Sequence, residues 1–139
     1  MKRLAAALAL ALLTTTAASA QSYPGDPGVG TERGVEQVNN SGQVGTVTLF
    51  RRGAATSVVV DLKGTEPGRV QSVRIYRGKS CEEFDPGGPV YFLNDMRNGR
   101  SVSSVKAVEE KLLSGNYNVV VFSSNVKDAR ATACGHLYS

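Results

Sequence analysis

The chain offers few side chains that could perform chemistry. His136 is the only histidine, which excludes any site that needs two imidazole groups. Glu82, Glu83 and Asp85 form an acidic cluster, but it lacks the alternating ligand spacing of a calcium-binding loop, so we interpret it as a solvated loop. No serine lies in the Gly-x-Ser-x-Gly motif of hydrolases. We therefore expect no catalytic residue, no metal site and no cofactor.

The N-terminus has the pattern of a signal peptide. Lys2 and Arg3 precede an unbroken run of Ala and Leu over residues 4–13, and residues 18–20 read Ala-Ser-Ala, the small-x-small triplet that signal peptidase accepts. An apolar run of about ten residues is too short to cross a bilayer, which takes about twenty. We expect residues 1–20 to be removed, no membrane span, and a periplasmic or extracellular location.

Export bears on the two cysteines, Cys81 and Cys134. An even pair of cysteines in an oxidising compartment is normally bridged. The alternatives are a thiol redox pair, which usually has the spacing Cys-x-x-Cys, and a metal site, which needs further ligands nearby. We expect a disulfide, which would stabilise the fold by about 4 kcal/mol if it acts by restricting the unfolded chain.

The charge of the chain does not favour a nucleic-acid partner. With 16 basic and 12 acidic residues the formal net charge is +4, and removal of Lys2 and Arg3 with the signal peptide lowers it to +2. Charges of both signs are spread along the chain, and aromatic residues are few. Nucleic-acid-binding domains instead concentrate basic charge on one face.

The rest of the chain has the pattern of one β domain. Residues 21–34 are rich in Gly and Pro and predict a flexible lead-in, whereas residues 35–139 alternate apolar and polar side chains between turns. Strands are expected at residues 43–50, 57–63, 71–77, 90–93, 101–105, 116–122 and 131–138. A short helix is expected within residues 105–113, with Glu109 and Glu110 on a solvated face. Short strands at this spacing favour an antiparallel sandwich or barrel.

Residues 43–138 resemble the copper/zinc superoxide dismutase family. The motif Gly88-Pro89-Val90-Tyr91-Phe92 stands where that family reads Gly-Pro-His-Phe, and Ala133-Cys134-Gly135-His136-Leu137 resembles its closing Ala-Cys-Gly-Val-Ile. The other similar segments are residues 45–50, 62–64, 67–68, 73–81 and 115–122. The resemblance implies an antiparallel Greek-key β-sandwich of the dismutase type, with Cys81 and Cys134 at the positions of the family's disulfide.

The metal ligands of that family are missing. Arg74 and Tyr76 stand where it places two copper-binding histidines, residues 90–92 replace the bridging and zinc histidines, and the late copper histidine falls on or beside Phe122. Arginine cannot coordinate copper or zinc at neutral pH. Arg130 lies near the family's substrate-guiding arginine, although it is one residue farther from the second cysteine than the pattern requires. We expect neither tight copper binding nor dismutation of superoxide.

These observations favour a non-catalytic binding or structural module. Val73 and Ile75 occupy the core-facing positions of their strand, so Arg74, Tyr76 and Arg77 form a candidate binding face for a protein or anionic ligand. The same face could also be an ordinary cationic surface. The oligomeric state stays open.

Two other functions remain as alternatives. One is a copper-binding enzyme related to the dismutases, which would use His136 together with tyrosine, carboxylate or backbone ligands. The other is an exported inhibitor or envelope-stress protein, in which the disulfide-bonded domain blocks another exported protein.

Overall fold

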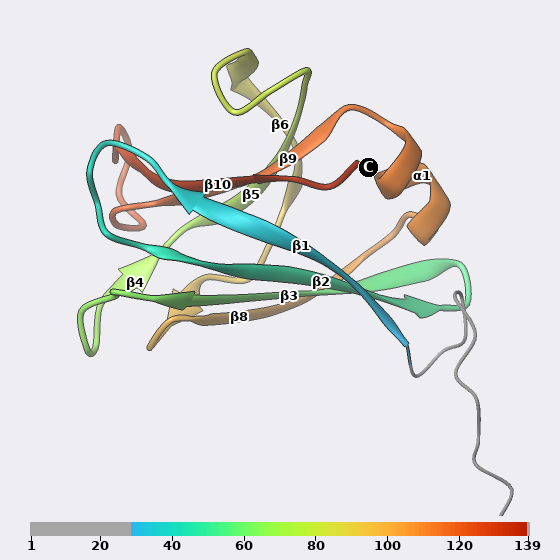
Figure 1. Cartoon of the computed structure of the whole chain (residues 1–139), viewed down its shortest axis with the longest axis horizontal. Coiled ribbons are helices and arrows are strands. Elements are labelled where there is room, and N and C mark those ends of the chain that lie inside the picture. The colour runs from blue at the N-terminus through green and yellow to red at the C-terminus, as the bar shows by residue number, and fades with distance from the viewer. Residues whose placement is uncertain (1–28, 139) are drawn as a thin grey trace, which may run out of the picture.

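The computed structural model describes residues 29–138, except for the side chains of residues 86 and 87. The expected signal peptide and residues 21–28 of the expected lead-in lie outside the described residues. The described chain is mostly antiparallel β-sheet with one short helix, arranged as two facing layers (Figure 1). It contains no helix that is long and apolar enough to cross a membrane.

The strands form two sheets that share one strand. Sheet A has the order β4 (Val70–Gln71), β7 (Met96–Arg97), β8 (Arg100–Val105), β3 (Ala55–Lys63), β2 (Val44–Arg52) and β1 (Gly30–Gln37). Sheet B continues from β1 through β10 (Ala131–His136), β9 (Tyr117–Phe122), β5 (Val73–Gly78) and β6 (Phe84–Phe92). Because β1 pairs with both β2 and β10, it closes one side of the sandwich.

The expected antiparallel sandwich is confirmed, but the expected N-terminal boundary is not. The sequence predicts a flexible lead-in up to residue 34, whereas β1 begins at Gly30 and pairs with β2 from Gly30 to Val35. The sequence pattern does not predict β1 because the strand contains Gly30 and Gly34, and glycine has a low β propensity. It is needed at this position because a Cβ on Gly30 would overlap the side chain of Thr48.

The main core lies between the two sheets and follows the expected alternation. Its strand residues include Val47, Leu49, Val58 and Val60 from sheet A, and Val73, Ile75, Val119 and Val121 from sheet B. All eight are at most 1% exposed. Because burial of such a side chain contributes about 1.5–3 kcal/mol, this inner layer supplies most of the stabilisation of the sandwich.

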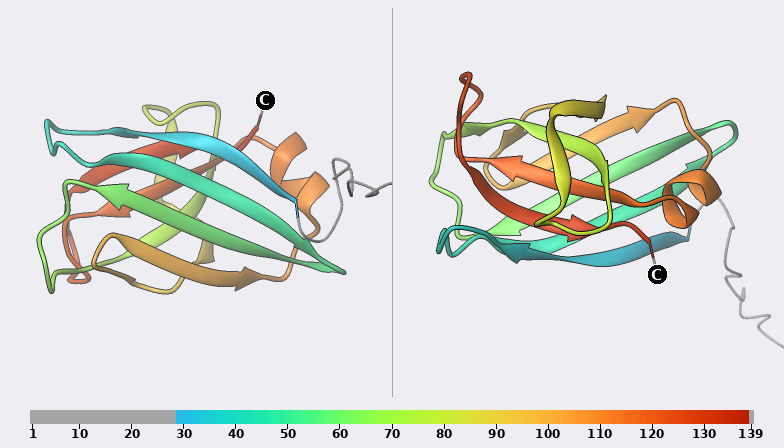
Figure 2. Two further views of the ribbon diagram at one scale, coloured as in Figure 1. Left: turned by 60° about the horizontal axis from the view of Figure 1, so that its bottom comes forward. Right: turned by 90° about the horizontal axis from the view of Figure 1, so that it is seen from above.

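A second, smaller cluster lies on the face of sheet B that points away from the main core, which we call the outer face. It contains Tyr76, Val120 and Cys134, with Phe84 packed against them. The connection between β5 and β6 runs across this face (Figure 2, right), and the disulfide from Cys81 to Cys134 ties it to β10. The expected disulfide is therefore confirmed, and it holds a loop over the sheet.

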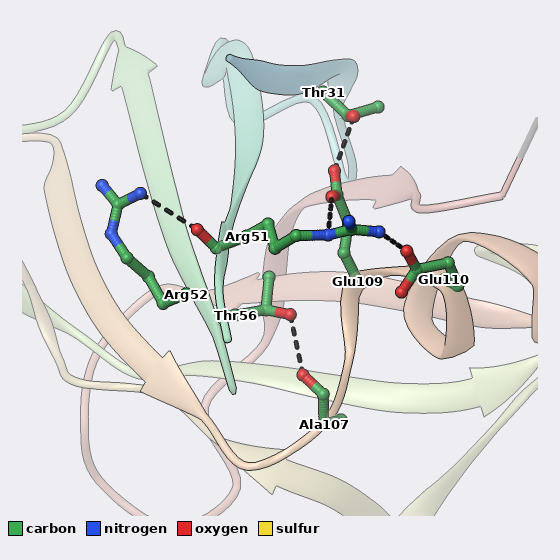
Figure 3. Close-up of polar contacts among 7 residues, drawn as sticks. All are labelled: Thr31, Arg51, Arg52, Thr56, Ala107, Glu109 and Glu110. Carbon is green, nitrogen blue, oxygen red and sulfur yellow. Dashed lines mark hydrogen bonds and ion pairs between the residues drawn. The ribbon is translucent and has the colours of Figure 1, made fainter. Parts of the chain in front are cut away.

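The helix α1 (Glu109–Ser114) is attached to sheet A by polar contacts (Figure 3). Thr31 Oγ1 donates a hydrogen bond of 2.7 Å to Glu109 Oε1, and Arg51 pairs with both Glu109 and Glu110. Glu109 is only 5% exposed, so the expected solvated face holds for Glu110 but is wrong for Glu109. A hydroxyl group from β1 and a guanidinium from β2 allow this carboxylate to be buried, and their approach to Glu109 depends on the folded chain.

Candidate functional site

Arg74 lies on the outer face of sheet B, on the central strand of a group of three. In the register of β5 it stands opposite Val120 of β9 and Phe92 of β6. Its neighbours Val73 and Ile75 point into the main core, so strand alternation directs Arg74 outward. The expected orientation of Arg74 is therefore confirmed.

Two aromatic rings hold the Arg74 side chain. Its guanidinium carbon Cζ lies 5.4 Å from the ring centroid of Phe92 and 5.4 Å from that of Phe122. Cation–π contacts at such distances contribute about 0.5–1 kcal/mol each at exposed sites. The rings restrict the rotamers of a long side chain and occupy the face of the guanidinium, not its N–H groups.

The N–H donors of Arg74 have no acceptor among the residues that the structure describes. Within residues 29–138, no hydrogen bond or ion pair joins its guanidinium to another residue, while Arg51, Arg69 and Arg100 each pair with a carboxylate. A guanidinium carries five N–H donors in a planar fork, which matches a carboxylate or a phosphate. Arg74 is thus a positioned cation whose donors are open to solvent or to a ligand.

A pocket of about 480 Å³ opens beside this guanidinium, between β5 and the loop that joins β9 to β10. Tyr76 and Phe122 supply its apolar wall, and Ser72 and Ser124 supply hydroxyl groups. The exposed loop residues Val126, Lys127 and Asp128 and the partly buried Ala129 complete its lining. We call this cavity the Arg74 pocket. Lys127 adds a second cation to it, and Asp128 adds one carboxylate.

Tyr76 shares the outer face with Arg74, as expected, but its ring is buried and only 1% of the residue is exposed. The ring centroid lies 4.9 Å from that of Phe84 and 6.2 Å from that of Phe122. The disulfide-bonded loop brings Phe84 over it. Tyr76 therefore supports the wall of the Arg74 pocket, and its burial limits the part of the candidate face that it can offer to a partner.

Arg77 does not belong to this face. It stands opposite Tyr117, a residue of the main core, and its Nη2 donates a hydrogen bond of 3.4 Å to the Tyr117 hydroxyl. Its Cζ also lies 5.7 Å from the Tyr117 ring centroid. The hydrogen bond to Tyr117 raises the pKa of Arg77. Strand alternation separates the two arginines, because Arg74 and Arg77 are an odd number of residues apart.

Arg130 lies in a different cavity. It is exposed, and with Glu66 and Arg69 it lines a pocket of about 250 Å³ at the end of the β9–β10 loop. Its backbone carbonyl accepts a hydrogen bond of 2.8 Å from the amide of Ser123. The structure therefore does not bring Arg130 together with Arg74.

His136 is held by a buried amide. Its Nδ1 lies 2.5 Å from Oδ1 of Asn118, whose Nδ2 donates to the carbonyl of Gly78. Because that amide oxygen can only accept, Nδ1 of the histidine is the donor, and no residue that the structure describes is hydrogen-bonded to Nε2. Across the described residues, no three His, Cys, Asp or Glu side chains gather into a group that could hold a metal ion.

Sequence reasoning missed Phe92 and Lys127 as members of the site. Phe92 is 71% exposed, which is unusual for a phenylalanine at an outward position of a strand. Alternation along the strand could have placed Phe92 on the outer face. Its contact with Arg74, however, depends on the pairing of β5 with β6. Lys127 lies in a loop whose path no periodicity predicts.

Comparison of the chain with protein-family models, with curated proteins and with solved structures finds no match.

Proposed function

We propose that the protein is an exported, non-catalytic binding module, built on a Greek-key sandwich of the copper/zinc superoxide dismutase type. In this proposal the outer face of sheet B binds a partner through Arg74 and the rings of Phe92 and Phe122. The observation that carries it is the state of Arg74: two rings position its guanidinium, its donors have no acceptor within residues 29–138, and a pocket lies beside it.

The spatial arrangement supports the dismutase resemblance. The resemblance aligned Arg74, Phe92 and Phe122 with or beside histidine positions of that family, from three segments far apart in the sequence. Arg74 contacts both Phe92 and Phe122 on one face of the sandwich. A dismutase-type scaffold would bring these positions together, so the contact is consistent with a surface that has replaced the metal positions.

The chemistry of this surface suits recognition better than catalysis. Arginine and aromatic residues are enriched among the side chains that dominate protein–protein binding energies. A general acid or base needs a titratable group at the reacting atom. Among the described residues that line the Arg74 pocket, the only carboxylate belongs to Asp128, an exposed loop residue, and none is a histidine.

Site-specific photo-crosslinking in cells that export the protein tests the proposal. The photoreactive amino acid p-benzoylphenylalanine replaces Phe92, which is 71% exposed beside Arg74, and in a control it replaces Val102, which is 51% exposed on sheet A. We expect one discrete crosslinked product from position 92 and none in common with position 102. Arg74→Glu should abolish the product, because it reverses the charge at the centre of the surface.

Arg77→Glu is the matched control, since Arg77 carries the same charge three positions away but lies on the Tyr117 side of the sheet. We expect it to leave the crosslink intact. A crosslink that survives Arg74→Glu, or that is lost equally in Arg77→Glu, would remove the Arg74 face as the binding surface.

A further inference from the structure

We infer that the Arg74 pocket binds a carboxylate group that is joined to an apolar or aromatic side chain. This inference deepens the proposed function and rests on it. It names the ligand chemistry that one peptide segment of a partner would present: a chain terminus or an acidic side chain, next to a hydrophobic residue.

The polar part of the pocket matches a carboxylate. Arg74 offers N–H donors that no residue of the range 29–138 engages, in a fork that can donate to two oxygens side by side. Ser72 is nearly buried at 9% exposure, and its hydroxyl lines the same cavity. Lys127 stands at the exposed side of the cavity as a second cation. A ligand oxygen placed at Arg74 therefore meets donors from a strand and a cation from a loop.

The charge balance favours a monoanion over a phosphate group. Arg74 and Lys127 bring two positive charges to the lining, and Asp128 brings one negative charge, so the pocket carries a net charge of +1. A phosphate monoester carries about −1.5 to −2 at neutral pH, and Asp128 would repel its excess charge. Phosphate sites also use runs of glycine amides or a helix N-terminus, and neither lines this pocket.

The apolar part of the pocket explains why the ligand needs a hydrophobic group. Tyr76 and Phe122 form a ring wall, and Val126 is 65% exposed at the cavity edge. Burial of apolar surface contributes about 25 cal/mol per Å², so a side chain against this wall adds affinity that a free anion lacks. A volume of about 480 Å³ lies within the usual range of ligand pockets, about 300–1,000 Å³.

An NMR titration of the ¹⁵N-labelled protein tests this inference with four probes. N-acetyl-L-phenylalanine presents a terminal carboxylate, and N-acetyl-aspartyl-phenylalanine amide presents a side-chain carboxylate. N-acetyl-L-phenylalanine amide has the ring without the charge, and phenyl phosphate has the ring with a different anion. We expect at least one carboxylate probe to shift the Nε–H resonance of Arg74 and the backbone amides of Ser124 and Lys127.

The affinities should follow the chemistry of the pocket. The amide should bind at least about tenfold more weakly than its matching acid, since it loses a charge-assisted hydrogen-bond pair. Arg74→Gln should weaken the acid by a similar factor, whereas Arg77→Gln should change it by less than about twofold. The acid-to-amide comparison uses the unmodified protein, so it is informative even if Arg74→Gln fails to fold.

Equal binding of acid and amide, binding unchanged in Arg74→Gln, or tighter binding of phenyl phosphate would overturn the inference. Its failure can be told apart from failure of the proposed function. If no carboxylate probe binds while the Phe92 crosslink still requires Arg74, the ligand class is wrong and the binding function stands. If a carboxylate probe binds but the crosslink ignores Arg74, the ligand class stands and the binding function falls.

Discussion

The guanidinium carbon of Arg74 lies 5.4 Å from the ring centroid of Phe122, and this contact joins two paired strands of sheet B, β5 and β9. Phe122 in turn packs against Tyr76, which the disulfide-bonded loop covers through Phe84. The position of Arg74 thus depends on a chain of packed rings that ends at the disulfide.

Removing the Phe92 ring should affect binding and spare stability. Phe92→Ala deletes one of the two rings that contact Arg74, so we expect crosslinked-partner affinity to fall by about two- to fivefold, equivalent to one cation–π contact. Because the residue is 71% exposed, the free energy of unfolding should change by less than about 0.5 kcal/mol. Titration and urea denaturation measure the two quantities.

Val102→Ala is the control for this change, since it removes a similarly exposed apolar side chain from sheet A. It should leave affinity unchanged. A large loss of stability in Phe92→Ala, or an equal loss of affinity in both variants, would contradict the role given to the ring.

The disulfide should stabilise the fold and the site together. Replacing Cys81 and Cys134 by serine should lower the free energy of unfolding by about 2–4 kcal/mol in urea denaturation. The loop over Tyr76 and Phe84 would lose its tether to β10, so hydrogen exchange should increase in β6. Reducing agent should destabilise the unmodified protein to a similar extent and leave the double variant unaffected; equal sensitivity of the two proteins would speak against this account.

The two glutamates at the start of α1 should differ sharply. Glu109→Gln keeps an acceptor for Thr31 but removes the charge that faces Arg51, and we expect a loss of about 1–3 kcal/mol of stability, as for buried hydrogen bonds to charged groups. Glu110→Gln removes a carboxylate whose side chain is 60% exposed, and surface pairs contribute about 0–1 kcal/mol. Thermal and urea unfolding of both variants measure the difference, and equal losses would refute the buried role of Glu109.

Copper should not stabilise the protein through His136. Asn118 already engages Nδ1, which leaves Nε2 as the one ring nitrogen for a metal, and the described residues supply no cluster of further ligands. We expect stoichiometric copper(II) to give no resolvable rise in Tm for the mature protein. A rise of several degrees that disappears in His136→Gln would favour the alternative of a copper enzyme with unorthodox ligands.

The features that the sequence predicted correctly are those that depend on local periodicity or on the number of cysteines. The alternation of Val73 and Ile75 with Arg74 and Tyr76 correctly assigned the two faces of β5, because side-chain direction in a strand depends only on position along it. It also gave the positions of most strands and the pairing of the two cysteines. Cysteine pairing followed from their number, since a pair leaves one connectivity.

The sequence could not predict what depends on segments that meet only in the folded chain. The burial of Tyr76 follows from Phe84 at the start of β6, and the burial of Glu109 follows from Thr31 and Arg51. The candidate face predicted from the sequence contains Arg74, Tyr76 and Arg77, which are close together along the chain. Strand alternation places Arg77 on the opposite side of the sheet from Arg74. The proposed surface, Arg74 with rings from β6 and β9, depends on the register of three strands.

The role of Arg74 as the binding group can be tested with the partner that is captured from position 92. Its dissociation constant is measured for the unmodified protein, for Arg74→Gln and for Arg77→Gln. All three proteins should unfold at similar urea concentrations, so that a difference in affinity reports the site. We predict that Arg74→Gln raises the dissociation constant at least about tenfold, as expected for the loss of a charge-assisted hydrogen-bond pair, and that Arg77→Gln changes it by less than about twofold. Equal effects of the two variants, or no effect of Arg74→Gln, would contradict the claim that Arg74 is the binding group.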